Sequence, residues 1–237
     1  MSLLESVSDD VGIVKISLSS FLPYGEYGMA AIKSICEEAN SFGMFIIFDS
    51  LLSDIGLPGR ALAEMFGKGA ITLSGKHEKM FAYDAITSHP YFADEGLESI
   101  ASMNKQDNVM AFFALHTDGR SADVQNMPVG DALVYENIAE KISRLGTASV
   151  DKNKNSAMGV MLSGLYEEEL NYMRSVMPQQ YFFLSEYKGE KVKVMEDKKC
   201  IIGMPIELQY VFRHDIFKDV EFSEAFKKSV QTLKSTL

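Results

Sequence analysis

The sequence predicts an α/β protein built on a parallel sheet or barrel. Seven short apolar segments alternate along the chain with segments whose apolar residues have helical spacing, and this alternation is typical of parallel strands joined by helices. Residues 44–47 and 109–115 are apolar throughout, as expected of strands that are buried on both faces. Polar residues follow these strands directly, where parallel α/β folds carry their chemistry.

The elements can be placed along the chain from these patterns. Strands are predicted over residues 11–17, 44–47, 83–88, 109–115, 158–162, 181–184 and 200–202. Helices are predicted over residues 28–40, 59–65, 97–103, 130–145, 167–176 and 222–233, and residues 1–10 resemble the end of a helix. The polar stretch 67–80 is expected to form a surface hairpin or flap, and residues 149–156 a long loop inside one domain that spans residues 1–237.

Composition and charge exclude several classes of protein. At 237 residues and 46% hydrophobic content, the chain can bury a sizeable core. The formal charge, 23 − 33 = −10, opposes binding to nucleic acid and to anionic membranes, so an anionic ligand would need a local cationic pocket. No apolar run approaches the roughly 18 residues of a membrane span, and the N-terminus lacks the layout of a signal peptide. We therefore expect a cytoplasmic protein without a nucleic-acid or membrane partner.

The cysteines and histidines predict neither a metal site nor a disulfide. Cys36 lies in a helical pattern and Cys200 in an apolar strand, and their spacing fits neither zinc nor a redox pair. No two His or Cys residues have metal-ligand spacing. We expect two buried, reduced thiols and no bound metal.

The candidate site lies where the second strand ends. Asp49 follows the apolar run 44–47, and Asp54 stands five residues further on. An Asp in this position can carry chemistry, or it can simply cap the next helix or turn the chain. Lys15 lies inside the first predicted strand. A charged side chain there needs a partner or a wet cavity, unless the position is a solvated edge, and we favour the cavity.

Several segments in sequence order resemble the orotidine 5′-phosphate decarboxylases, particularly their long bacterial form. Lys15 with Phe21 and Gly25 is similar to the family's Lys-Pro-Gln/Asn strand and its continuation. Residues 49–56 resemble Asp-x-Lys-x-x-Asp-Ile-Gly, and residues 84–91 resemble Asp-Ala-Val-Thr-Val-Asn-Pro-Tyr. Similar matches are found in residues 115–125 and 159–174.

The resemblance implies a fold and a reaction. The family is a (β/α)₈ TIM barrel that acts as a homodimer and converts orotidine 5′-phosphate to UMP without metal or cofactor. An Asp is set against the substrate carboxylate, and a Lys stabilises the charge left on the ring carbon and delivers the proton. By position, Asp49 is the first carboxylate, Lys15 the lysine of the preceding strand and Asp54 the carboxylate contributed across the dimer. Thr117 stands where a Ser reads the pyrimidine edge.

The chain departs from the family pattern at four places. Leu51 occupies the position of the catalytic lysine, and a leucine can neither offset a carbanion nor donate a proton. Residues 184–190 replace the glycine-rich phosphate loop and introduce Glu186 and Glu190, while Pro205 replaces the arginine that would hold the phosphate. Pro58 stands where the family has a threonine. Lys15 also lies so close to the start that the family's first strand and most of its first helix have no room.

Three functional hypotheses remain open. The first is a catalytically degenerate relative that keeps a pocket for a pyrimidine nucleotide and forms a homodimer. The second is an active decarboxylase in which Lys15, or a lysine of the 67–80 flap, takes the missing role. The third is a different enzyme on the same barrel that uses Lys15, Asp49, Asp54 and His116, since one fold can host several chemistries.

Overall fold

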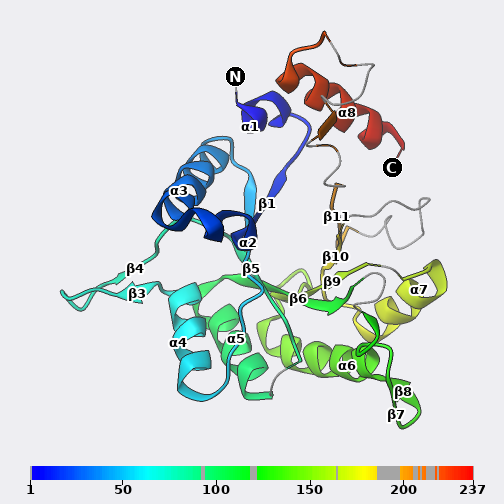
Figure 1. Cartoon of the computed structure of the whole chain (residues 1–237). Coiled ribbons are helices and arrows are strands. Elements are labelled where there is room, and N and C mark those ends of the chain that lie inside the picture. The colour runs from blue at the N-terminus through cyan, green and yellow to red at the C-terminus, as the bar shows by residue number, and fades with distance from the viewer. Residues whose placement is uncertain are drawn as a thin grey trace.

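A computed structural model shows that parallel strands, joined by helices, form one curled sheet (Figure 1). The structure describes residues 2–91, 94–117, 122–163, 165–185, 198–204, 208, 210–211, 217 and 219–236. The sheet strands are β1 (Ile13–Ser17), β2 (Phe45–Asp49), β5 (Ala85–Ser88), β6 (Met110–His116), β9 (Met158–Leu162), β10 (Phe182–Leu184) and β11 (Cys200–Ile202). They lie in this order, with every neighbouring pair parallel. All seven predicted strands are therefore confirmed.

The connecting helices also follow the predicted pattern. They are α3 (Gly25–Ser41), α4 (Gly56–Gly67), α5 (Asp94–Asp107), α6 (Val134–Gly146), α7 (Glu167–Val176) and α8 (Phe222–Thr236). Short helices α1 (Leu3–Val7), α2 (Leu18–Phe21), η1 (Leu22–Tyr24) and η3 (Thr147–Ser149) complete the helical part. The main differences from prediction are at the helix ends. α3 and α4 begin three residues earlier, and α5 extends by three or four residues at each end. The helix predicted over residues 130–145 begins only at Val134, because residues 132–133 form a short strand.

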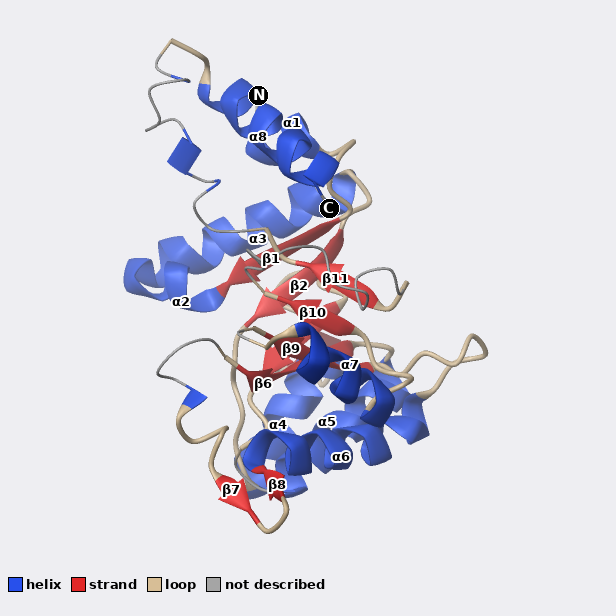
Figure 2. Cartoon of the chain, turned by 90° about the vertical axis from the view of Figure 1, so that its right-hand side faces the viewer, coloured by secondary structure: helices blue, strands red, loops and turns tan. Residues whose placement is uncertain are grey.

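The sheet is an incomplete barrel. In the described part of the chain β1 pairs only with β2, and β11 pairs only with β10, so the two outer strands do not close onto each other. Figure 2 shows the strands twisting around a common interior, with α4, α5, α6 and α7 packed outside. This confirms the predicted TIM-type architecture without its first strand.

Alternate side chains along each strand pack on opposite faces of the sheet. Ile46 and Phe48 belong to the large cluster between sheet and helices, whereas Ile47 packs in a second cluster with Ala85, Phe112 and Phe183. Because neighbours in a strand point to opposite faces, the second cluster marks the interior of the barrel. Asp49 follows Ile47 by two residues and so lies on this interior face.

The first and last helices pack against each other beside the open side of the sheet, as Figures 1 and 2 show. The amide of Gln231 in α8 donates to Asp10 Oδ2 at 2.9 Å, and the ammonium of Lys234 lies 3.4 Å from Asp10 Oδ1. The hydrogen bond from Gln231 and the charge of Lys234 lower the pKa of the Asp10 carboxyl. Helices therefore connect the two ends of the incomplete barrel.

The predicted flap is an antiparallel hairpin made of β3 (Ala70–Ile71) and β4 (His77–Glu78). It projects from the body of the protein (Figure 1). A second small hairpin, β7 (Pro128–Val129) with β8 (Ala132–Leu133), precedes α6. None of the described helices is long and apolar enough to cross a membrane.

The prediction for the two thiols is half correct. Cys36 is buried, and burial raises the pKa of its thiol to about 11. Cys200 is only partly buried, because β11 is the outer strand and one of its sides has no described neighbour.

Candidate active site

Lys15 and Asp49 meet on the interior face, near the carboxyl ends of two neighbouring strands. The Lys15 ammonium lies 3.0 Å from Asp49 Oδ2, with the two side chains 31% and 7% exposed. The parallel register pairs Ser17 with Asp49, so Lys15 lies two residues before the point opposite the acid. The charged residue in β1 therefore has a carboxylate partner, which is one of the alternatives left open for Lys15 rather than the wet cavity that sequence analysis favours, and β1 is an outer strand. Its part in catalysis stays a prediction.

The second oxygen of Asp49 is held by Thr87 from the next strand, β5. The hydroxyl of Thr87 donates to Asp49 Oδ1 at 2.7 Å, and Thr87 is fully buried. Sequence analysis missed this residue, because a threonine inside an apolar strand gives no signal beyond its place in the 84–91 segment. Its hydrogen bond depends on which strand lies beside β2, and this cannot be read from spacing.

Leu51 occupies a tight turn just after β2. Its φ is +50°, in the left-handed region that a branched residue adopts at a cost of about 1–2 kcal/mol. The backbone N–H of Leu51 donates to Thr87 Oγ1 at 3.0 Å, and its side chain is 45% exposed. The surrounding hydrogen bonds therefore hold an unfavourable backbone conformation in place.

Asp54 lies in the same loop but does not join the acid and base. Its Oδ1 accepts the N–H of Ile55 at 2.8 Å, and within the described part of the chain no ion pair connects it to Lys15 or Asp49. Leu52, Ile55 and Leu57 around it are exposed. The structure thus brings together two of the three predicted catalytic residues and leaves Asp54 on the surface.

The predicted pyrimidine reader, Thr117, is engaged by another side chain. Its N–H and hydroxyl both donate to Gln125 Oε1, at 2.8 and 3.1 Å. The neighbouring His116 is buried and lies 2.7 Å from the carbonyl of Ser163 and 3.1 Å from Asn126 Oδ1. His116 therefore ties the end of β6 to its surroundings, and Thr117 is held by Gln125 in this state.

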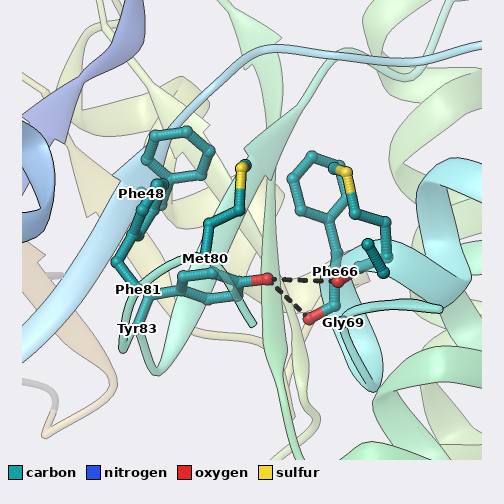
Figure 3. A pocket seen from close by; sticks show the side chains of 8 residues that line it. Phe48, Phe66, Gly69, Met80, Phe81 and Tyr83 are labelled. Carbon is teal, nitrogen blue, oxygen red and sulfur yellow. Dashed lines mark hydrogen bonds between the residues drawn. The ribbon is translucent and has the colours of Figure 1, made fainter. Parts of the chain in front are cut away.

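The outer face of β2 packs against aromatic side chains rather than polar ones. Figure 3 shows Phe48, Phe66, Phe81 and Tyr83 around a small apolar pocket under the base of the hairpin. The hydroxyl of Tyr83 donates to the carbonyl of Phe66 at 2.9 Å, and burial raises the pKa of this phenol. This packing fixes the strand that carries Asp49, because Phe48 is the residue before it.

The described residues contain no cluster of side chains that could bind a metal ion. Among those residues, no group of three His, Cys, Asp or Glu side chains could hold a metal ion. Burial lowers the pKa of His89, which follows β5. The neutral form of His89 therefore predominates at pH 7. The cation that contacts Asp49 is the ammonium of Lys15.

We compared the sequence and the fold of this chain with those of known proteins. No family model matches the chain. The orotidine 5′-phosphate decarboxylase of Caldicellulosiruptor bescii is 24% identical over 230 residues, which cover 93% of this chain and 75% of the relative. The same enzyme from Rhodopirellula baltica is 23% identical over 189 residues, or 79% of this chain and 61% of the relative.

The chain resembles the orotidine 5′-phosphate decarboxylases. Solved structures agree on the fold. The OMP decarboxylase of Leishmania donovani superposes with a TM-score of 0.70 at 18% identity, covering 99% of this chain and 84% of that one. The orotidine 5′-monophosphate decarboxylase of Plasmodium berghei gives 0.72 at 17% identity, with 99% and 70% covered.

The structure locates some departures from the decarboxylase pattern. Leu51, at the position of the family lysine, lies in the turn held by Thr87. Gly203 and Met204 follow β11 directly, but Glu186, Glu190 and Pro205 of the predicted phosphate region lie outside the described residues.

Proposed function

We propose that this protein is a decarboxylase relative whose site has lost most of its catalytic power while keeping a pocket for a pyrimidine nucleotide. It would belong to the lineage of UMP biosynthesis and act in the cytoplasm. Leu51 is the observation on which the proposal rests. The decarboxylase reaction needs a cation at this position to offset the developing carbanion and to supply a proton, and an aliphatic side chain can do neither.

Polar groups remain on the interior face of the sheet, where a ligand of this family would bind. Asp49 keeps two partners, the Lys15 ammonium at 3.0 Å and the Thr87 hydroxyl at 2.7 Å. A buried carboxylate without partners is strongly destabilising, and these two contacts stabilise Asp49 on the interior face of the sheet. Removing one preorganised group from such a site commonly lowers the rate roughly 10²–10³-fold.

One alternative is favoured by a specific contact. Lys15 touches Asp49 and could act as a displaced proton donor in an active decarboxylase. Among the flap lysines, Lys79 is less suitable, since it lies over the ring of Tyr83 at 4.9 Å from its centroid. Lys15 is thus the residue that an active enzyme would use.

We also propose that the protein forms a homodimer through the loop after β2. Leu52, Ile55 and Leu57 are large apolar side chains exposed beside Asp54, and such clusters on a surface mark interaction sites. In this assembly Asp54 would face the partner's site. Light scattering should give twice the mass of the 26.4 kDa chain.

The test measures binding and turnover separately. The unmodified protein is titrated with UMP and with orotidine 5′-phosphate, while thermal stability and CO₂ release are followed. We expect stabilisation by the nucleotides, because a ligand that binds only the folded state raises its stability, with little or no CO₂. The variant Leu51→Lys should gain at least roughly 10²-fold in turnover.

Each contrary result has a distinct meaning. Turnover by the unmodified protein at a rate typical of its relatives would refute the loss of catalytic power, and its disappearance in Lys15→Met would assign it to Lys15. No thermal shift with either nucleotide would refute the pocket.

A further inference from the structure

Three hydrogen bonds join residues 50–52, in the turn after β2, to Thr87 and Ser88 of β5. The hydroxyl of Ser50 donates to the carbonyl of Thr87 at 2.9 Å, and the N–H of Leu51 donates to Thr87 Oγ1 at 3.0 Å. The hydroxyl of Ser88 donates to the carbonyl of Leu52 at 2.8 Å. The turn includes Leu51, whose left-handed backbone is unfavourable for a branched side chain. An arrangement of this kind persists only when its surroundings impose it.

The direction of each hydrogen bond at Thr87 follows from its chemistry. A threonine hydroxyl has one proton to donate and can accept through its lone pairs. The Leu51 N–H can only donate, so Thr87 Oγ1 accepts there. Its own proton then goes to Asp49 Oδ1, 2.7 Å away. Lys15, Asp49, Thr87 and Leu51 thus form one continuous polar chain across β1, β2 and β5.

We infer that Thr87 is a positioning residue, whose single buried hydroxyl orients the carboxylate of Asp49 and fixes the backbone of residue 51 at the same time. It is fully buried and so acts through these two residues rather than on a ligand. The inference rests on the proposed function, because residue 51 is where the decarboxylases carry their lysine. Because the contact with Thr87 is made by the backbone N–H of residue 51, a lysine introduced at this position would keep it.

The alternative is that Thr87 only fills space between strands. Two substitutions separate these roles, because Thr87→Val keeps the branched shape and removes the hydroxyl, while Thr87→Ser keeps the hydroxyl and removes the methyl group. Ser88→Ala is the matched control, since it removes a hydrogen bond to the same turn without touching Asp49.

The decisive measurements are made by NMR on the full chain without ligand. In Thr87→Val, the Leu51 amide should exchange with solvent at least tenfold faster and the carboxyl ¹³C resonance of Asp49 should shift. Thr87→Ser should leave both close to the unmodified protein, and Ser88→Ala should leave the Asp49 resonance unchanged. Unchanged exchange and an unchanged resonance in Thr87→Val would overturn the inference.

Two further readouts keep the inference testable. If Thr87→Val does not fold, the unmodified protein still decides, because a Leu51 N–H held by Thr87 Oγ1 exchanges more slowly than an unprotected amide, and exchange at the unprotected rate would refute the geometry. In the Leu51→Lys protein, adding Thr87→Val should lower the gained turnover at least tenfold, whereas adding Thr87→Ser should retain most of it. Should Leu51→Lys gain no turnover, the proposed function fails while the NMR result still decides the role of Thr87.

Discussion

The ion pair between Lys15 and Asp49 allows a quantitative test of how the site contributes to stability. We consider Asp49→Asn, which keeps the shape of the side chain and removes its charge. In the folded protein one oxygen faces the Lys15 ammonium at 3.0 Å and the other accepts the Thr87 hydroxyl at 2.7 Å. The asparagine amide presents only one oxygen. With that oxygen turned to Lys15 the contact is no longer charged on both sides, and the NH2 group then faces Thr87, whose hydroxyl can no longer donate to residue 49.

The size of the effect follows from these contacts. A hydrogen bond to a charged group contributes about 1.5–3 kcal/mol. Lys15 is 31% exposed, and solvent screening reduces the Coulombic part of the interaction. We therefore expect Asp49→Asn to lower the free energy of unfolding by roughly 1–2 kcal/mol.

Urea denaturation at pH 7 measures this difference, with the surface pair of Lys141 and Asp94 as the control. Their ammonium and carboxylate lie 2.9 Å apart, but the side chains are 39% and 63% exposed. Exposed ion pairs contribute little, so Asp94→Asn should leave the midpoint almost unchanged. Equal effects of the two substitutions would refute the idea that the interior pair is protected from solvent.

Three further predictions concern packing, reactivity and pH. Gly159→Ala should lower stability by roughly 2–3 kcal/mol, because its Cβ would lie 2.7 Å from the ring of Phe112; Gly12→Ala, with no atom within 4 Å of the new Cβ, should be neutral in the same denaturation experiment. Cys36 should stay unmodified by iodoacetamide at about pH 8 in the native protein and react fully in urea, as mass spectrometry would show, because its thiol is buried and its pKa is raised to about 11. The lowered pKa of Asp10 means that its ionised form stabilises the fold above about pH 5 and that this stabilisation is lost as the pH falls through the lowered value, so Asp10→Asn should reduce the melting temperature at pH 7 but not near pH 2.

The sequence was sufficient to predict the strands and most helices, because the apolar runs and the helical spacing that mark them are local patterns. The run 109–115 is apolar throughout, and β6 occupies residues 110–116. These conclusions need only periodicity. The sequence singles out both Lys15 and Asp49 as candidate site residues, but it does not predict their pairing, since a wet cavity is favoured for Lys15.

What the sequence could not provide depends on contacts between distant segments. The hydroxyl of Thr87 reaches Asp49 from 38 residues away, and Gln125 accepts both donors of Thr117 from eight residues further along the chain. The left-handed turn at Leu51 gives no sequence signal at all, since leucine is a poor residue for it.

The contact between α1 and α8 has a consequence for synthesis of the protein. Asp10 and Gln231 are 221 positions apart, so α1 leaves the ribosome long before the helix that covers it exists. During that interval α1 lacks the helix on which it packs, and incompletely packed chains are prone to associate with one another. The packing of α8 on α1 is therefore a late step in the folding of the chain.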